Sequence, residues 1–268
     1  MTTITIGNKN DNETELYHAI ENSKSGDTIK LLPGTYFSQS RPCVFTIKHN
    51  LTIIGQTHNP DAIQLNLGFL LGEGATLIAQ NFALSFGGEH FNTIAMYDNS
   101  ELFGRNLHIS HTSKDKWDCV YGKSAHISLV DSKIDIDNLN SSSLDLYDCQ
   151  LYLENAHVAG LITKQTDSSV KNAIIDDTIY LDDNSTLKFV DLTINSNDNQ
   201  AFCELYALNN SKVTGQLLKT TSSAPTIGVA ESNLNVNEFE PDLENITWYF
   251  DDNSEVLADS TRPYTSGL

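Results

Sequence analysis

The stretch from residue 16 to residue 56 decides the fold. It reads LYHAIENSKSGDTIKLLPGTY (16–36) and then, after a polar gap, VFTIKHNLTIIGQ (44–56). After its first ten residues come the short aliphatic and β-branched runs TIKLL, VFTI and LTIIG, separated by turn residues such as Pro33 and Gly34. Runs of this length and composition are typical of β-strands. The stretch therefore predicts one helix that leads into several short strands.

The helix is expected over residues 13–24. Asn12 stands three residues before Glu15, which is the spacing of a capping box. The apolar residues that follow share one helix face, and they are Leu16, Ala19 and Ile20. Gly26 is expected to end the helix.

A helix that ends in GDTIKLLPGTY and is followed by strands ending in LTIIGQ resembles the N-terminal cap and first turns of right-handed parallel β-helix proteins of the pectate-lyase-like superfamily. The resemblance implies that the helix covers the open hydrophobic end of the coil. The superfamily includes pectate and alginate lyases, polygalacturonases, pectin methylesterases, epimerases, phage tailspike domains and proteins with no known reaction. The resemblance therefore predicts a fold and leaves the activity to be argued from the residues.

An aliphatic pattern recurs along the chain, as a solenoid requires. Its copies begin 17 to 27 residues apart, at Leu31, Ile53, Leu77, Leu102, Leu129, Leu146, Val170, Leu187, Val213, Leu234 and Val256. The repeat predicts an all-β chain, a single domain over 1–268 that forms a right-handed parallel β-helix of about ten coils. The coils are expected over 28–258, after the helical cap, with a C-terminal tail over 259–268 that covers the last coil or hangs free.

A second recurring piece is an alternating strand that runs into a polar corner, as in TIAMYDNS (93–100), TIYLDDNS (178–185), ELYALNNS (204–211) and ITWYFDDNS (246–254). Because side chains alternate along a strand, one face receives Ile94, Met96, Ile179, Leu181, Ile246 and Trp248. We expect the corners to form an asparagine and serine ladder along the stack. A calcium-binding or catalytic role of the acidic corners is the less favoured alternative.

Composition excludes several classes of protein. The formal net charge is −19, from 35 acidic and 16 basic residues, so nucleic-acid binding is not expected. Outward acids keep an exposed sheet soluble, which predicts a monomer or a weak oligomer; a trimer of the tailspike kind is the alternative. Mimicry of duplex DNA is disfavoured because no five-residue repeat is present. No segment has the length and hydropathy of a membrane span, and no membrane partner is expected.

The N-terminus shows no secretory signal, which predicts a cytoplasmic protein unless a leader is missing or export is leaderless. The four cysteines are widely spaced, and no pair has the spacing of a zinc site. We expect free thiols, mostly buried, at Cys43, Cys119, Cys149 and Cys203.

Pectin methylesterases and polygalacturonases carry clusters of Asp, Gln, His and Arg on successive coils, and no set of residues in this sequence matches such a cluster. A lyase needs a base and a group that neutralises the uronate, and the only arginines are Arg41, Arg105 and Arg262. Five acids fall on neighbouring coils and could form a row of carboxylates on one face, but ordinary outward positions in solvent are the favoured interpretation. They are Asp131, Asp135, Asp137, Asp145 and Asp148. No cofactor is expected, and calcium only if the chain is a lyase.

The segment from 105 to 123 is the candidate ligand site. The segment contains four basic and two acidic residues, so its formal net charge is +2 with both histidines neutral, in a protein that is acidic as a whole. It also contains Trp117, whose ring could stack on a sugar. Loops that project from a β-helix flank its groove. The candidate ligand-binding residues are Arg105, His108, His111, Lys114, Lys116, Trp117 and Lys123. An ordinary solvated loop with its tryptophan folded onto the coil is the alternative.

Two functions follow from these observations. The favoured one is a non-catalytic β-helix that binds a carbohydrate or a protein partner along the side of the solenoid. The alternative is a polysaccharide lyase or glycoside hydrolase with an atypical site near 105–123.

Overall fold

The computed structural model describes residues 1–7, 11–37, 43–114, 117–137, 142–195, 204–240, 242–258 and 263–264. The chain is a parallel β-solenoid of about ten turns, which confirms the predicted fold class. It divides into two compact units, Met1–Ser143 and Leu144–Leu268, and each unit has two parallel sheets. The expectation of a single domain stays a prediction. No helix among these residues is long and apolar enough to span a membrane.

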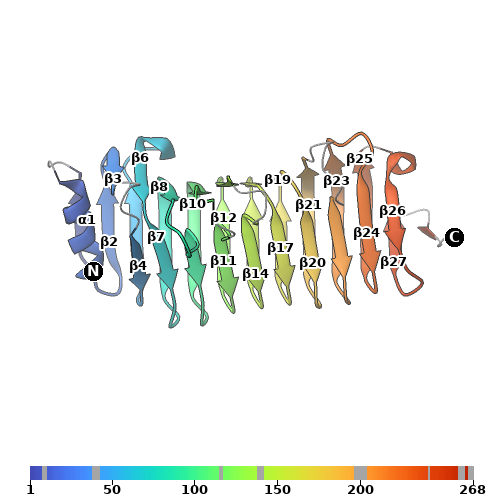
Figure 1. The fold of residues 1–268 in the computed structure, drawn as a ribbon, viewed down its shortest axis with the longest axis horizontal. Coiled ribbons are helices and arrows are strands. Elements are labelled where there is room, and N and C mark those ends of the chain that lie inside the picture. Colours follow the sequence, from blue (N-terminus) through green and yellow to red (C-terminus); the bar gives the residue numbers. More distant parts are fainter. Residues whose placement is uncertain are drawn as a thin grey trace. The chain divides into compact units, whose positions relative to one another are not determined.

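In the first unit, each coil gives one or two strands to the first sheet and one strand to the second sheet (Figure 1). The first sheet contains β1 (Thr3–Ile6), β2 (Asp27–Leu31), β3 (Gly34–Tyr36), β5 (Leu51–Gly55), β6 (Ile63–Asn66), β8 (Thr76–Phe86), β10 (Glu101–His111), β12 (His126–Val130) and β13 (Lys133–Ile136). The second sheet contains β4 (Val44–Ile47), β7 (Gly68–Leu71), β9 (Ile94–Met96) and β11 (Val120–Lys123). A short 3₁₀ turn, η1 (Pro60–Ala62), precedes β6.

The second unit repeats the arrangement. Its first sheet contains β15 (Gln150–Glu154), β16 (His157–Val158), β18 (Asp167–Lys171), β19 (Ala173–Ile175), β21 (Thr186–Ile194), β23 (Lys212–Thr220), β25 (Asn233–Glu240), β27 (Glu255–Ala258) and β28 (Pro263–Tyr264). Its second sheet contains β14 (Leu144–Tyr147), β17 (Leu161–Lys164), β20 (Ile179–Asp182), β22 (Leu205–Leu208), β24 (Thr226–Ala230) and β26 (Thr247–Phe250). A 3₁₀ turn, η2 (Leu243–Asn245), precedes β26.

The N-terminal cap is α1 (Asn12–Glu21), which buries Leu16, Ala19 and Ile20 as predicted. Its expected bounds were wrong at both ends. Asp11 is the N-cap, because its Oδ1 accepts a hydrogen bond from the Thr14 backbone N–H at 3.0 Å. The helix stops at Glu21, well before Gly26. Residues 3–6, for which no strand was predicted, form β1 and pair in parallel with β2.

The core follows the strand register within each unit. Leu51, Leu77, Leu102 and Ile127 are consecutive partners in the first unit and are all buried. Three of the predicted anchors in this unit are therefore displaced, Ile53 and Leu129 by two residues and Leu31 by four. In the second unit Val170 is displaced by two residues, because Ser168 is the partner of Leu187. Stacking aliphatic side chains in this way removes them from water at every coil.

A fifth predicted anchor, Leu146, lies in the second sheet, in β14. The error has a physical cause. The coil from Leu151 to its partner Ser168 is short, and leucines stand on both sides of the corner at Asp148, so the aliphatic pattern continues across that corner.

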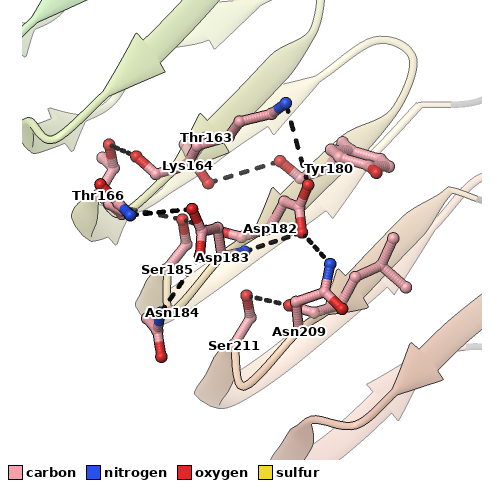
Figure 2. Close-up of polar contacts among 12 residues, drawn as sticks. Thr163, Lys164, Thr166, Tyr180, Asp182, Asp183, Asn184, Ser185, Asn209 and Ser211 are labelled. Atoms are coloured by element: carbon pink, nitrogen blue, oxygen red, sulfur yellow. Dashed lines mark hydrogen bonds and ion pairs between the residues drawn. The ribbon is translucent and has the colours of Figure 1, made fainter.

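The corners carry the predicted ladder, in which serine and threonine side chains make the buried bonds (Figure 2). In the second unit the Thr166 backbone N–H donates to Ser185 Oγ at 3.3 Å, and Ser185 Oγ donates to the Asp182 carbonyl at 2.7 Å. The corner asparagines supply left-handed backbone angles, such as φ 68° at Asn184.

A separate asparagine ladder, which the sequence analysis missed, lies at the bend of the first sheet. Asn106 Nδ2 donates to Asn81 Oδ1 at 2.9 Å, and Asn172 Nδ2 donates to Asn155 Oδ1 at 3.3 Å. All four residues have left-handed φ angles, between 50° and 60°. Amide side chains that bond along the stack fix this bend at successive coils.

Three cysteines are free thiols as expected. Cys119 and Cys149 are buried and Cys43 is half-buried, while Cys203 lies outside the described residues. Close packing is visible at Gly215, where an added Cβ would lie 2.1 Å from the Phe189 ring. The C-terminal strand β28 pairs antiparallel with β27, so this part of the tail closes onto the last coil.

Candidate functional site

The residues predicted to form the ligand site lie on three parts of one coil in the first unit. Arg105 and His108 are on the first sheet, in β10. Lys114 and Trp117 are exposed in the connection that follows, and Lys123 ends β11 in the second sheet. Lys116 lies outside the described residues. The six of these residues that the structure describes therefore do not share one face.

His111 was expected in the loop, and that placement was wrong. It is the last residue of β10, on the inward-facing side with Leu107 and Ile109, and it is fully buried. Its Nδ1 lies 3.2 Å from Thr93 Oγ1. A hydroxyl partner allows a histidine to occupy an apolar interior, so His111 is a core residue.

His108 is the centre of a charged cluster on the outside of the first unit. Its Nε2 lies 2.9 Å from Asp135 Oδ2 and its Nδ1 lies 3.1 Å from Asp61 Oδ1. The hydrogen bond to Asp135 is the main reason that the pKa of His108 is raised, and the contact with Asp61 adds to it. The charged imidazole then donates from both nitrogens.

Asp135 is also bound by Lys133, whose Nζ lies 2.7 Å from Asp135 Oδ2. Burial acts to raise the pKa of Asp135, yet the bonds from His108 and Lys133 together leave it lowered. When His108 is protonated, the cluster holds two carboxylates and two cations, and both ring nitrogens of His108 are engaged. It is suited to holding η1 against β10 and poorly suited to general base catalysis.

The other candidate acids do not make a row. Asp131 is at the bend of the first sheet, Asp137 follows β13, Asp145 is in β14 of the second sheet, and Asp148 is at a corner. No group of three or more His, Cys, Asp or Glu side chains within the described ranges is placed to hold a metal ion.

The second unit has an aromatic surface on the outward face of its second sheet. Tyr180, Tyr206, Gly228 and Tyr249 are consecutive partners on four successive strands. The rings of Tyr180 and Tyr206 are 5.9 Å apart at their centroids. Tyr249 is 63% exposed, which is unusual for a large aromatic residue without a partner surface.

Glycine takes the third position of this row, and Gly228 itself is buried. Tyr206 and Tyr249 stand two strands apart, which corresponds to about 9.5 Å at the ordinary strand spacing. A hollow of about 590 Å³ is formed by residues of β22, β24, β26 and the corner that follows β26, and we call it the aromatic hollow. It is lined by Tyr206, Leu208, Gly228, Val229, Ala230, Trp248, Tyr249, Phe250, Asp251 and Asp252.

Trp248 was expected in the core and is half-buried. Its ring lies against Phe239, with centroids 5.8 Å apart, and it also lines the aromatic hollow. It belongs to the last strand of the second sheet. Trp248 can therefore report on a ligand in the hollow.

Carboxylates stand at the corner beside the hollow. Asp251 accepts hydrogen bonds from Ser254 Oγ at 2.6 Å and from the backbone N–H groups of Asn253 and Glu231. The bond from Ser254 is the first cause of the lowered pKa of Asp251, so its carboxylate is ionised at neutral pH. Three coils earlier in the sequence, the equivalent corner holds Asp182, which accepts from Asn209 Nδ2 at 2.6 Å (Figure 2).

The sequence analysis missed the tyrosine row, although a signal was present. Tyr180, Tyr206 and Tyr249 each stand five residues before a corner serine, in three of the four segments that defined the corners. Alternation assigned their neighbours to the core and left these rings outside. A hollow lined by aromatic rings, with a few polar groups at its edge, can stack on the face of a sugar ring.

No protein-family model and no curated protein matches the chain. Solved structures do match it. An alginate lyase from Paenibacillus sp. str. FPU-7 has a TM-score of 0.49 at 12% identity, over 94% of this chain and 99% of the other. The PL6 family alginate lyase AlyGC has a TM-score of 0.41 at 12% identity, over 96% of this chain, which spans only 40% of that lyase. Pectate lyase Pel9A has a TM-score of 0.38 at 11% identity, over 95% and 78%.

The strand register of the chain is that of the parallel β-solenoid that the N-terminal stretch predicted. At such identities the likeness concerns the fold alone.

Proposed function

We propose that this chain is a non-catalytic carbohydrate-binding β-helix and that the aromatic hollow is its binding surface. The observation that supports the proposal is the 590 Å³ hollow, whose lining includes the rings of Tyr206, Trp248 and Tyr249. Tyr249 is 63% exposed, so its ring is open to a ligand. Stacked rings prefer centroid separations from about 4.5 Å, and a sugar ring in the hollow can approach Tyr249 in this way.

The energetic contribution of such stacking is modest. Each ring-to-ring contact adds about 1 kcal/mol beyond the area that it buries. Two contacts change the dissociation constant by about thirtyfold. Micromolar binding then requires hydrogen bonds besides, for which carboxylates and backbone groups of the hollow are available.

The test is binding of oligosaccharides to the wild type and to Tyr249→Ala, with Tyr147→Ala as the matched control. Tyr147 is an exposed tyrosine on the second sheet of the same unit and does not line the hollow. We expect about fivefold weaker binding for Tyr249→Ala and an unchanged constant for Tyr147→Ala. Equal binding by all three proteins would place the sugar elsewhere.

Tryptophan fluorescence separates this surface from the segment 105–123. A ligand in the aromatic hollow should change the emission of Trp117→Phe and leave that of Trp248→Phe unchanged. The opposite result would support the site around Arg105, His108 and Trp117 instead.

A polysaccharide lyase or hydrolase near 105–123 is the second candidate. The observation in its favour is that Arg105 is exposed on β10, the strand that also carries His108, so a basic group is open to a substrate there. Absorbance at 235 nm over pectate, alginate and glycosaminoglycans, with and without calcium, tests for elimination, and a reducing-sugar assay tests for hydrolysis. Turnover that is lost in Arg105→Ala would reverse the order of the two proposals.

A further inference from the structure

We infer that the sugar bound by the aromatic hollow carries protonated amines, so that the ligand is an oligosaccharide of amino sugars and neither a polyuronate nor a neutral glycan. This inference rests on the proposed function, because it names the ligand class of the same surface.

The first step is the charge of the lining. Of the ten residues around the hollow, Asp251 and Asp252 are acidic, and the described lining contains no lysine, arginine or histidine. Asp252 is exposed. A uronate would meet uncompensated repulsion there, in a protein whose formal net charge is already −19.

The second step is the state of Asp251. Its hydrogen bonds from Ser254 Oγ and from two backbone N–H groups all favour the ionised carboxylate. Negative charge is therefore fixed at the edge of the hollow, and a ligand does not have to induce it. Each oxygen can accept further bonds, because a carboxylate has about four acceptor positions.

The third step is the chemistry of the rings. The face of a tyrosine ring is negative and attracts an ammonium group that lies within about 6 Å of its centre. Tyr206 and Tyr249 stand on either side of Gly228, and Asp251 follows Tyr249 by two residues on the same side of the chain. A pyranose stacked on Tyr249 in the hollow then has its amine close to both an aromatic face and a carboxylate.

The fourth step is the contrast with the equivalent corner at Asp182, three coils earlier. At Asp182 the carboxylate has Lys164 Nζ at 4.0 Å and Asn209 Nδ2 at 2.6 Å, so a cation from the protein already stands there (Figure 2). On the next two strands, the residues in register with Asp182 are Leu208 and Ala230, which are uncharged. Beside Asp251, the amine of the ligand takes the place that Lys164 takes beside Asp182.

The experiment measures binding of three hexasaccharides, one of glucosamine, one of N-acetylglucosamine and one of galacturonate, to the whole chain in low salt at a pH where the amines are charged. We expect the glucosamine oligomer to bind about tenfold more tightly than the acetylated one, with the uronate weakest. Asp252→Asn should reduce this preference about threefold. Asp191→Asn, the same change on the exposed face of the first sheet, should leave it intact.

The outcomes distinguish the two proposals. If none of the oligomers binds, the proposed carbohydrate function fails. If the acetylated or uronate oligomer binds as tightly as the glucosamine oligomer, or if Asp252→Asn keeps the full preference, only the amino-sugar inference fails. A trimethyllysine peptide serves as a further arm, and tighter binding of that peptide would overturn the assignment to a sugar.

Discussion

Replacement of Ser185 by alanine should destabilise the second unit. Ser185 is fully buried at a corner, where its Oγ accepts from the Thr166 N–H at 3.3 Å and donates to the Asp182 carbonyl at 2.7 Å. Alanine leaves the Thr166 N–H without this acceptor in the interior. The cost of one buried unsatisfied group is about 1 to 3 kcal/mol.

The matched control is Ser185→Thr. The preceding coil carries Thr166 at the equivalent position, where its Oγ1 accepts from the Cys149 N–H at 3.2 Å, so the ladder accommodates threonine. Urea unfolding followed by circular dichroism should show the alanine variant to be less stable and the threonine variant close to wild type. Equal stability of the alanine and threonine variants would refute the role of the hydroxyl.

Three further predictions concern the fold. The pKa of His108 is raised in the folded protein, so the stability that protonated His108 contributes is complete below its pKa in the unfolded chain and is lost as the pH rises through its pKa in the folded protein. Asp135→Asn should lower the pKa of His108 in an NMR titration. An unchanged pKa would contradict the pairing of His108 with Asp135. Gly215→Ala should cost about 1 to 3 kcal/mol because of overpacking, whereas Gly72→Ala, which meets nothing within 4 Å, should be neutral in thermal unfolding. Burial raises the pKa of the Cys119 thiol, so this thiol should react with a disulfide reagent only after unfolding; fast reaction of the native protein would contradict its burial.

The fold was predictable because its cause lies in a local and periodic pattern. Aliphatic residues such as Leu77 and Leu102 recur at the coil length, and each buries its side chain against its partner. The pattern failed where the coil length changed. Around Leu146, leucines before and after a corner had the spacing of a single strand, and only the three-dimensional register separates them.

Burial of His111 could have been predicted by the same alternation that buried Leu107 and Ile109. Its residue type favoured a loop, because a histidine usually needs a polar partner when buried. That partner is Thr93 Oγ1, which comes from the start of the second-sheet segment of the preceding coil. A contact between residues far apart in the sequence does not appear in a local reading of either segment.

The aromatic hollow illustrates a second limit of local reading. Gly228 weakens a strand when it is judged by propensity alone, since it adds no side chain to the sheet. In the register of the coils, the same glycine stands between Tyr206 and Tyr249 and is one of the residues that line the aromatic hollow. The net charge of −19 likewise describes the average surface, while ligand choice depends on where Asp251 and Asp252 stand relative to those rings. In a solenoid, the position of a residue along the stack therefore determines its contribution to binding more directly than its type does.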